Sequence, residues 1–162
     1  MSVLFSSGEL INIAIGIERN GAAFYESLAK EGRDAKSRDT YEYLADMERE
    51  HIKIFSKMLD SMGTFNLPES YTEEYDLYLK SLVGSAIFTD DKVAREMAQK
   101  VADSAEAIQI GIVAEKDSIL FYSEMQHLVP ERERKLVNNI IDEEKSHLRQ
   151  LSDLKKELTK GG

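Results

Sequence analysis

The stretch Glu48-Arg49-Glu50-His51 and its counterpart Glu144-Lys145-Ser146-His147 each place a glutamate three residues before a histidine. They lie at matching positions in the two halves of the 162-residue chain, and each is preceded by another glutamate, Glu18 or Glu115, one helix length earlier. Residues three apart share one side of an α-helix, so each pair can act on a single partner. The repeated order of these side chains predicts a four-helix bundle whose core holds a carboxylate-bridged pair of metal ions.

The composition narrows the class of protein. The chain is 42% hydrophobic and 31% charged, and its net charge of −9 would be repelled by the phosphates of nucleic acid. No apolar run approaches the roughly 20 residues of a membrane span, and the first ten residues lack the basic start of a secretory signal. We therefore expect a cytoplasmic protein. Cysteine is absent, which excludes disulfides, iron–sulfur clusters and four-cysteine iron sites on this chain.

Hydrophobic periodicity predicts an all-α chain that forms one domain over residues 1–162. Two helical hairpins are expected, joined by a long crossover that contains two short helical segments, 73–82 and 90–101. The expected long helices span 7–31, 35–62, 104–126 and 130–158, and the crossover spans 63–103.

Helix starts are marked by capping residues. Ser6 and Glu9 have the spacing of a capping box, and so do Asp103 and Glu106. Thr89 is expected to cap the second short helix of the crossover.

One glutamate of each long helix lies on its apolar face. At about 100° per residue, Glu144 lies in the middle of an apolar stripe and His147 lies about 60° to one side. An unpaired buried carboxylate is costly, and four of them together would repel one another strongly. Two divalent cations would neutralise four carboxylates, and neutral imidazoles would add donors without charge. The predicted metal ligands are Glu18, Glu48, His51, Glu115, Glu144 and His147.

A third Glu-x-x-His pair, Glu124 and His127, shows that the spacing alone is not specific. Glu124 lies about 180° from Glu115 around the same helix, on its outer side. We therefore exclude this pair as ligands and expect it to form a solvated helix end.

Tyr25 and Tyr122 each follow an upstream glutamate by two helical turns on the same face. Two compatible interpretations remain: core aromatic residues whose hydroxyls find some acceptor, or candidate catalytic side chains that donate to a ligand carboxylate near the metals. Glu143 is adjacent to Glu144 but about 100° around the helix, so it could either support a metal ligand or lie at the surface, and we favour the surface.

These residues together resemble the ferritin-like di-iron carboxylate superfamily, and most of all its rubrerythrin branch. The matching positions are Glu18 with Phe24-Tyr25, Glu48 with His51, Glu115 with Phe121-Tyr122, and Glu144 with His147. The resemblance extends over residues 7–158 and implies a ferritin-like bundle with two iron ions, for which manganese or a mixed manganese–iron pair could substitute. It leaves open whether Glu48 bridges the metals together with Glu115 or with Glu144.

Two departures from rubrerythrins affect the expected function. Without cysteine the chain has no rubredoxin domain, so an external electron donor would be needed. The additional carboxylate that rubrerythrins carry on the third long helix would fall at Ser118, whose repeat counterpart is Gly21.

The resemblance implies a peroxidase or oxidase that acts on hydrogen peroxide or dioxygen in oxidative-stress defence. The sequence shows no obvious pocket for a large substrate, which favours such a small oxidant. Two alternatives use the same residues: a ferroxidase that handles iron, and a structural bundle that metal stabilises without catalysis. A homodimer is expected from the prevalence of two-fold symmetric assemblies.

Overall fold

The computed structural model describes residues 3–32, 34–62 and 65–160. Its helices are α1 (Ser7–Glu31), α2 (Ala35–Met62), α3 (Glu73–Gly84), α4 (Asp91–Lys100), α5 (Ser104–Met125) and α6 (Glu131–Lys160). This order confirms the prediction of an all-α chain, and the expected crossover helices correspond to α3 and α4. Within these ranges, no helix combines the length and the apolar character needed to cross a membrane.

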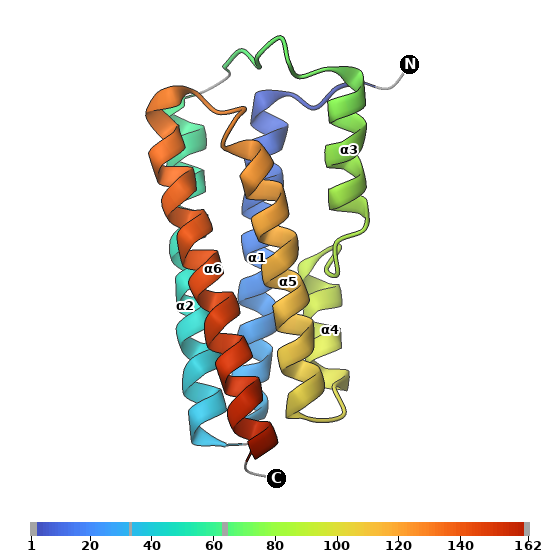
Figure 1. Cartoon of the computed structure of the whole chain (residues 1–162), viewed down its shortest axis with the longest axis vertical. Coiled ribbons are helices and arrows are strands. Elements are labelled where there is room, and N and C mark those ends of the chain that lie inside the picture. Colours follow the sequence, from blue (N-terminus) through green and yellow to red (C-terminus); the bar gives the residue numbers. More distant parts are fainter. Residues whose placement is uncertain (1–2, 33, 63–64, 161–162) are drawn as a thin grey trace.

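The four long helices form the bundle, and the crossover helices lie along one side of it (Figure 1). One hairpin pairs α1 with α2, and the other pairs α5 with α6. The crossover passes outside the bundle, where α3 contacts α5 and α4 contacts α1. The crossover therefore covers the α1–α5 side, whereas α2 and α6 face away from it.

The predicted capping box at the start of α1 is present. The Glu9 amide donates to Ser6 Oγ at 3.1 Å, and the Ser6 amide donates to Glu9 Oε1 at 3.3 Å. At the start of α5, Asp103 caps the Glu106 amide at 2.8 Å, as predicted. The Glu106 carboxylate accepts instead from the Ala102 amide at 2.7 Å, so only half of that box has the expected form.

The predicted cap of α4 was wrong by one residue. Asp90, not Thr89, has the extended backbone of an N-cap and accepts from the Val93 amide at 2.8 Å. Asp is the stronger capping residue, and its carboxylate also interacts favourably with the positive end of the helix dipole.

The core consists of two apolar clusters, one toward each end of the bundle. The first contains Leu10, Ile11, Phe55, Tyr122, Val137 and Ile140, and the second contains Phe24, Tyr25, Leu44, Ile108, Leu151 and Leu154. On every long helix the glutamate identified above lies between the residues that belong to one cluster and those that belong to the other. Packing the two clusters therefore brings four carboxylates to one level in the middle of the bundle.

Candidate metal centre

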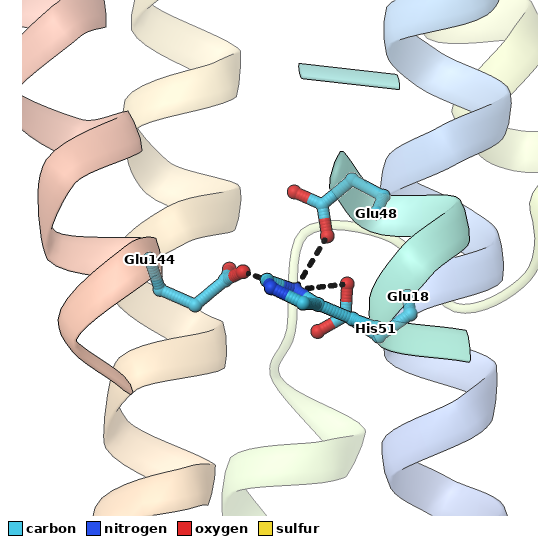
Figure 2. Close-up of side chains that lie close together, drawn as sticks. All are labelled: Glu18, Glu48, His51 and Glu144. Carbon is cyan, nitrogen blue, oxygen red and sulfur yellow. Dashed lines mark ion pairs between the residues drawn. The ribbon is translucent and has the colours of Figure 1, made fainter. Parts of the chain in front are cut away.

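The four core glutamates and the two histidines gather in one buried cluster. Glu18, Glu48, Glu115 and Glu144 are between 0% and 3% exposed, and His51 and His147 are 0% and 1% exposed. Figure 2 shows four residues of this cluster, in which Glu144 from α6 faces Glu48 and His51 from α2 and Glu18 from α1. Each long helix contributes its carboxylate because a residue on its apolar stripe must point at the bundle axis.

The cluster divides into two overlapping groups that could each hold a metal ion. One group consists of Glu18, Glu48, His51 and Glu144, and the other consists of Glu48, Glu115, Glu144 and His147. In each group the candidate ligand atoms all lie within 4.8 Å of one another. Glu48 and Glu144 belong to both groups, whereas each group has one glutamate and one histidine of its own.

The first group centres on Nδ1 of His51. This nitrogen lies 2.9 Å from Glu144 Oε1, 3.4 Å from Glu18 Oε2 and 3.9 Å from Glu48 Oε2. Donor atoms that bind one ion at about 2.1 Å lie about 3 Å apart at right angles and about 4.2 Å apart when opposite. The observed separations therefore match the spacing of atoms around one common ion.

The second group has the same form around Nδ1 of His147. This nitrogen lies 3.6 Å from Glu48 Oε1 and 3.7 Å from the Oε1 atoms of both Glu115 and Glu144. The rings of His51 and His147 are stacked with their centroids 6.0 Å apart. The two nitrogens thus approach the shared carboxylates from the two hairpins, as the internal repeat of the sequence implies.

Two tyrosines cross-link the hairpins at the level of the cluster. Tyr25 of α1 donates to Glu115 Oε1 of α5 at 2.7 Å, and Tyr122 of α5 donates to Glu18 Oε1 of α1 at 2.7 Å. Each tyrosine therefore donates to the unshared glutamate of the opposite hairpin. Burial, followed by the nearby carboxylates, raises the pKa of both hydroxyls well above the usual value, so both remain protonated donors.

Of the two positions that the sequence left open for Glu143, the structure shows the less favoured one, beside a candidate metal ligand. Its Oε2 makes a short contact with His51 Nε2, although the side chain remains 44% exposed. A residue 100° from the core face can still reach a neighbouring helix, and the adjacent positions of Glu143 and Glu144 on α6 were the available signal. A carboxylate on the outer ring nitrogen fixes the orientation of an imidazole whose inner nitrogen binds metal.

His147 has a different outer environment. Its ring meets the edge of the Tyr43 ring at 6.2 Å between centroids, and its Nε2 has no hydrogen bond within the described part of the chain. The internal repeat therefore holds for the core carboxylates of the two halves. It does not hold for the side chains that contact the outer faces of the two histidines.

The third Glu-x-x-His pair lies away from this cluster. His127 is exposed, in agreement with the expected solvated helix end. Glu124 is half-buried and accepts from the Tyr75 hydroxyl at 2.5 Å, so it ties α3 to α5 and is not simply solvated. The angular position on the helix was sufficient to separate this pair from the other two.

Burial and mutual repulsion shift the titration of the cluster. Burial first, and then the neighbouring carboxylates, raises the pKa of Glu48 and Glu144 well above 4.5. Burial alone would raise the pKa of Glu115, but the nearby His147 ring and the Tyr25 hydroxyl that donates to this carboxylate lower it. Burial alone would lower the pKa of His51, but Glu144 and Glu18 raise it to about 11. Without metal, the cluster therefore holds protons to limit its negative charge.

We expect the metal-free protein to lose stability as the pH rises above about 5. The folded state binds more protons at Glu48 and Glu144 than the unfolded chain above 4.5, and more at His51 between 6.5 and about 11. Each excess proton lowers the free energy of unfolding by about 1.4 kcal/mol per pH unit. Urea unfolding of chelator-treated, dialysed protein at pH 5.5, 7 and 8.5 measures this slope. A free energy of unfolding that stays constant or rises with pH would contradict the excess of protons assigned to the folded cluster.

Several buried oxygen and nitrogen atoms of the cluster form no hydrogen bond with the described residues. Among the described residues, these include Glu18 Oε2, Glu115 Oε2, both carboxylate oxygens of Glu144 and both ring nitrogens of His147. Most buried polar atoms in proteins are hydrogen-bonded, because an unpaired one costs about 1–3 kcal/mol. The carboxylate oxygens and Nδ1 of His147 could serve as ligands to two divalent cations, which would balance four carboxylate charges. The donor set therefore fits a pair of oxygen- and nitrogen-preferring metal ions such as iron or manganese.

A cavity of about 230 Å³ reaches the cluster from the α1–α5 side and is bordered by Glu48, Glu115 and Tyr25. The sequence did not indicate such a space. It adjoins the bundle face on which α3, α4 and their connection lie.

Comparison with known proteins agrees with this architecture. The model of the family described as Rubrerythrin matches residues 9–155. Among solved structures, the chain is similar to a Thermotoga maritima protein described as a ferritin-like diiron-carboxylate protein. The two chains are 27% identical, the match covers 97% of this chain and 99% of that one, and the TM-score is 0.69. No protein of curated function matches the chain.

Proposed function

The chain belongs to the rubrerythrin family, and from this premise we propose that its buried cluster binds two iron ions and reduces hydrogen peroxide or dioxygen. The observation that carries the proposal is the pair of overlapping ligand groups that share Glu48 and Glu144. Isolated buried ion pairs would not need two carboxylates that each face both histidines. The similar Thermotoga maritima protein is itself described as a diiron-carboxylate protein, which supports the same assignment.

In this proposal the shared and unshared residues have different roles. Glu18 and His51 would hold one ion, Glu115 and His147 would hold the other, and Glu48 and Glu144 would be within reach of both. Of the two bridging arrangements compatible with the sequence, the shared membership of Glu144 favours the pair Glu48 and Glu144.

When bound, two Fe2+ ions supply the two electrons that reduce one hydrogen peroxide, with two protons, to two water molecules. The protein's own residues prepare the site for this chemistry. The two apolar clusters exclude bulk water from both ends of the cluster, and the tyrosine bonds fix the oxygens of Glu18 and Glu115. Electrons for a second turnover would have to come from a separate donor, because the chain has no cysteine to hold an iron–sulfur or rubredoxin-type centre.

Peroxide oxidation of the iron-loaded protein tests this function. We expect one equivalent of hydrogen peroxide to oxidise both Fe2+ ions of the anaerobically loaded wild-type protein, as followed by stopped-flow absorbance and by Mössbauer spectroscopy. The double variant Glu144→Gln/His147→Asn should lose at least 90% of this reaction because it removes one bridging and one terminal ligand.

The matched control is Glu124→Gln/His127→Asn, which makes the same two changes in the Glu-x-x-His pair outside the cluster. It should oxidise iron at the wild-type rate. Equal rates for both double variants would contradict the proposal, as would a wild-type protein that retains less than one ion per chain after loading. Independently of these rates, elemental analysis of freshly purified protein distinguishes bound iron from bound manganese.

A further inference from the structure

The cavity beside the cluster is a partly open space with an apolar wall and a polar floor. Its wall includes Ile13, Ile17 and Phe121, and its floor is formed by Glu48, Glu115 and Tyr25. The connection between α3 and α4, including Ala86–Thr89, covers its outer side. Hydrogen peroxide or dioxygen needs only a fraction of 230 Å³. The space is therefore larger than the proposed oxidants require.

Small side chains create this space. Gly16 and Gly21 of α1 and Ser118 of α5 all line the cavity. A Cβ atom on Gly16 would meet nothing within 4 Å, and one on Gly21 would lie 3.4 Å from the Glu48 carboxyl carbon. The Ser118 hydroxyl donates to the Ala114 carbonyl of its own helix at 3.1 Å and so does not fill the cavity. Larger side chains at Gly16, Gly21 and Ser118 would occupy part of the cavity.

The cover of the cavity is fixed by specific contacts. The Ile87 amide donates to Asp117 Oδ2 at 2.9 Å, and Asn20 Nδ2 donates to the Phe88 carbonyl at 3.4 Å. The Phe88 ring also packs against Phe24 with 4.8 Å between centroids. The α3–α4 connection is thereby bound to both α1 and α5, so the cavity is preformed and does not need a ligand to open it.

The lining defines the chemistry of a suitable ligand. A dry cavity of about 150 Å³ accommodates benzene, and drug-sized ligands occupy about 300–1,000 Å³, so this space suits a molecule between these sizes. Among the residues that the structure describes, the lining includes the acids Glu48, Glu115 and Asp117 but no lysine or arginine. An anionic ligand would be repelled, whereas a neutral molecule could place an apolar body against the wall and a polar end at the floor.

We propose that this cavity binds a neutral organic molecule of roughly 8–12 non-hydrogen atoms, with one hydroxyl- or carbonyl-sized end directed at Glu48 and Glu115. The ligand would lie against the carboxylates that form the candidate metal centre. The protein alone forms the cavity, so this binding goes beyond the proposed function and does not require the metals.

The test uses metal-free, full-length protein and 1-octanol as the probe, with binding measured by isothermal titration and by saturation-transfer NMR. We expect wild-type protein to bind 1-octanol at least tenfold more tightly than octanoate, which has the same chain but carries a negative charge. Gly16→Leu should weaken octanol binding at least tenfold, because the new side chain enters open space in the cavity. The leucine also favours the helix, so this variant should fold.

The matched control is Gly8→Leu, the same change on the same helix at another glycine with open space around its Cβ position, outside the cavity. It should bind octanol as wild-type protein does. As a measurement without mutation, a crystal soaked with 8-bromo-1-octanol should show bromine anomalous density among Ile13, Ile17 and Phe121.

Three results would overturn the proposal: no octanol binding to wild-type protein, equal affinity for octanol and octanoate, or unchanged binding in Gly16→Leu. Bromine density only outside the cavity would do the same. Metal binding is measured separately by titration of the wild-type protein, so failure of the metal proposal and failure of this one are distinguishable.

Discussion

Saturating the metal-free protein with Mn2+, or with Fe2+ in the absence of oxygen, is expected to raise its free energy of unfolding by about 5 kcal/mol. This value applies when each of two sites is exposed to free ion at about 100 times its dissociation constant, which contributes about 2.7 kcal/mol per site. The physical reason is that the ions bind only the folded state, where four carboxylates and two imidazoles already converge. Urea unfolding followed by circular dichroism, with and without metal, measures the change.

The variant Glu124→Gln/His127→Asn provides the control for this prediction. It keeps the buried cluster intact, so its gain in stability on adding metal should equal that of the wild-type protein. A wild-type gain below about 1 kcal/mol at saturating metal would contradict the presence of two sites. A gain that disappears in the control would place the metal at the α5 end instead of the bundle centre.

Glu48→Gln is expected to change stability in opposite directions in the two states. In metal-free protein at pH 8 it should raise the free energy of unfolding by about 1–3 kcal/mol, because it removes one of four mutually repelling buried acids. Burial, together with Glu144, Glu18 and Glu115, already raises the pKa of Glu48. With metal present, the variant should lose most of the metal-dependent gain, because one of the two shared carboxylates is missing. Unfolding curves at pH 8, with and without Mn2+, give both values.

Glu50→Gln is the matched control for Glu48→Gln. Glu50 lies two residues away on the same helix, with its side chain 59% exposed and paired to Lys53. Its replacement should change stability by no more than about 0.5 kcal/mol in either state. If Glu48→Gln instead destabilised the metal-free protein and left the metal-dependent gain intact, Glu48 would be a structural hydrogen-bonding residue and not a ligand.

Local sequence rules accounted for the helices and for the faces they bury. Helix bounds and the Ser6 capping box followed from periodicity and capping chemistry, which act over a few residues. The same angular reasoning separated Glu144 and His147 from Glu124 and His127, although both pairs have identical spacing. The convergence of the six predicted side chains follows from these faces, since each core-facing carboxylate can point only toward the bundle axis.

Those local rules did not predict the contacts between side chains of different helices. Glu143 was placed at the surface from its angle on α6, but its side chain reaches His51 on α2. Glu124 was expected to be solvated, but Tyr75 of the crossover donates to it. The partners of Tyr25 and Tyr122 were likewise not defined by their own helices, because each hydroxyl crosses to the opposite hairpin.

The order of residues alone requires that four helices each present one glutamate to a common core, because side-chain direction repeats with the turn of the helix. The packing of the helices against one another sets which carboxylates the two ligand groups share and leaves a partly open cavity beside them. These features depend on the axial alignment and separation of helices distant in sequence. The volume left by Gly16, Gly21 and Ser118 arises only once the crossover covers that side of the bundle.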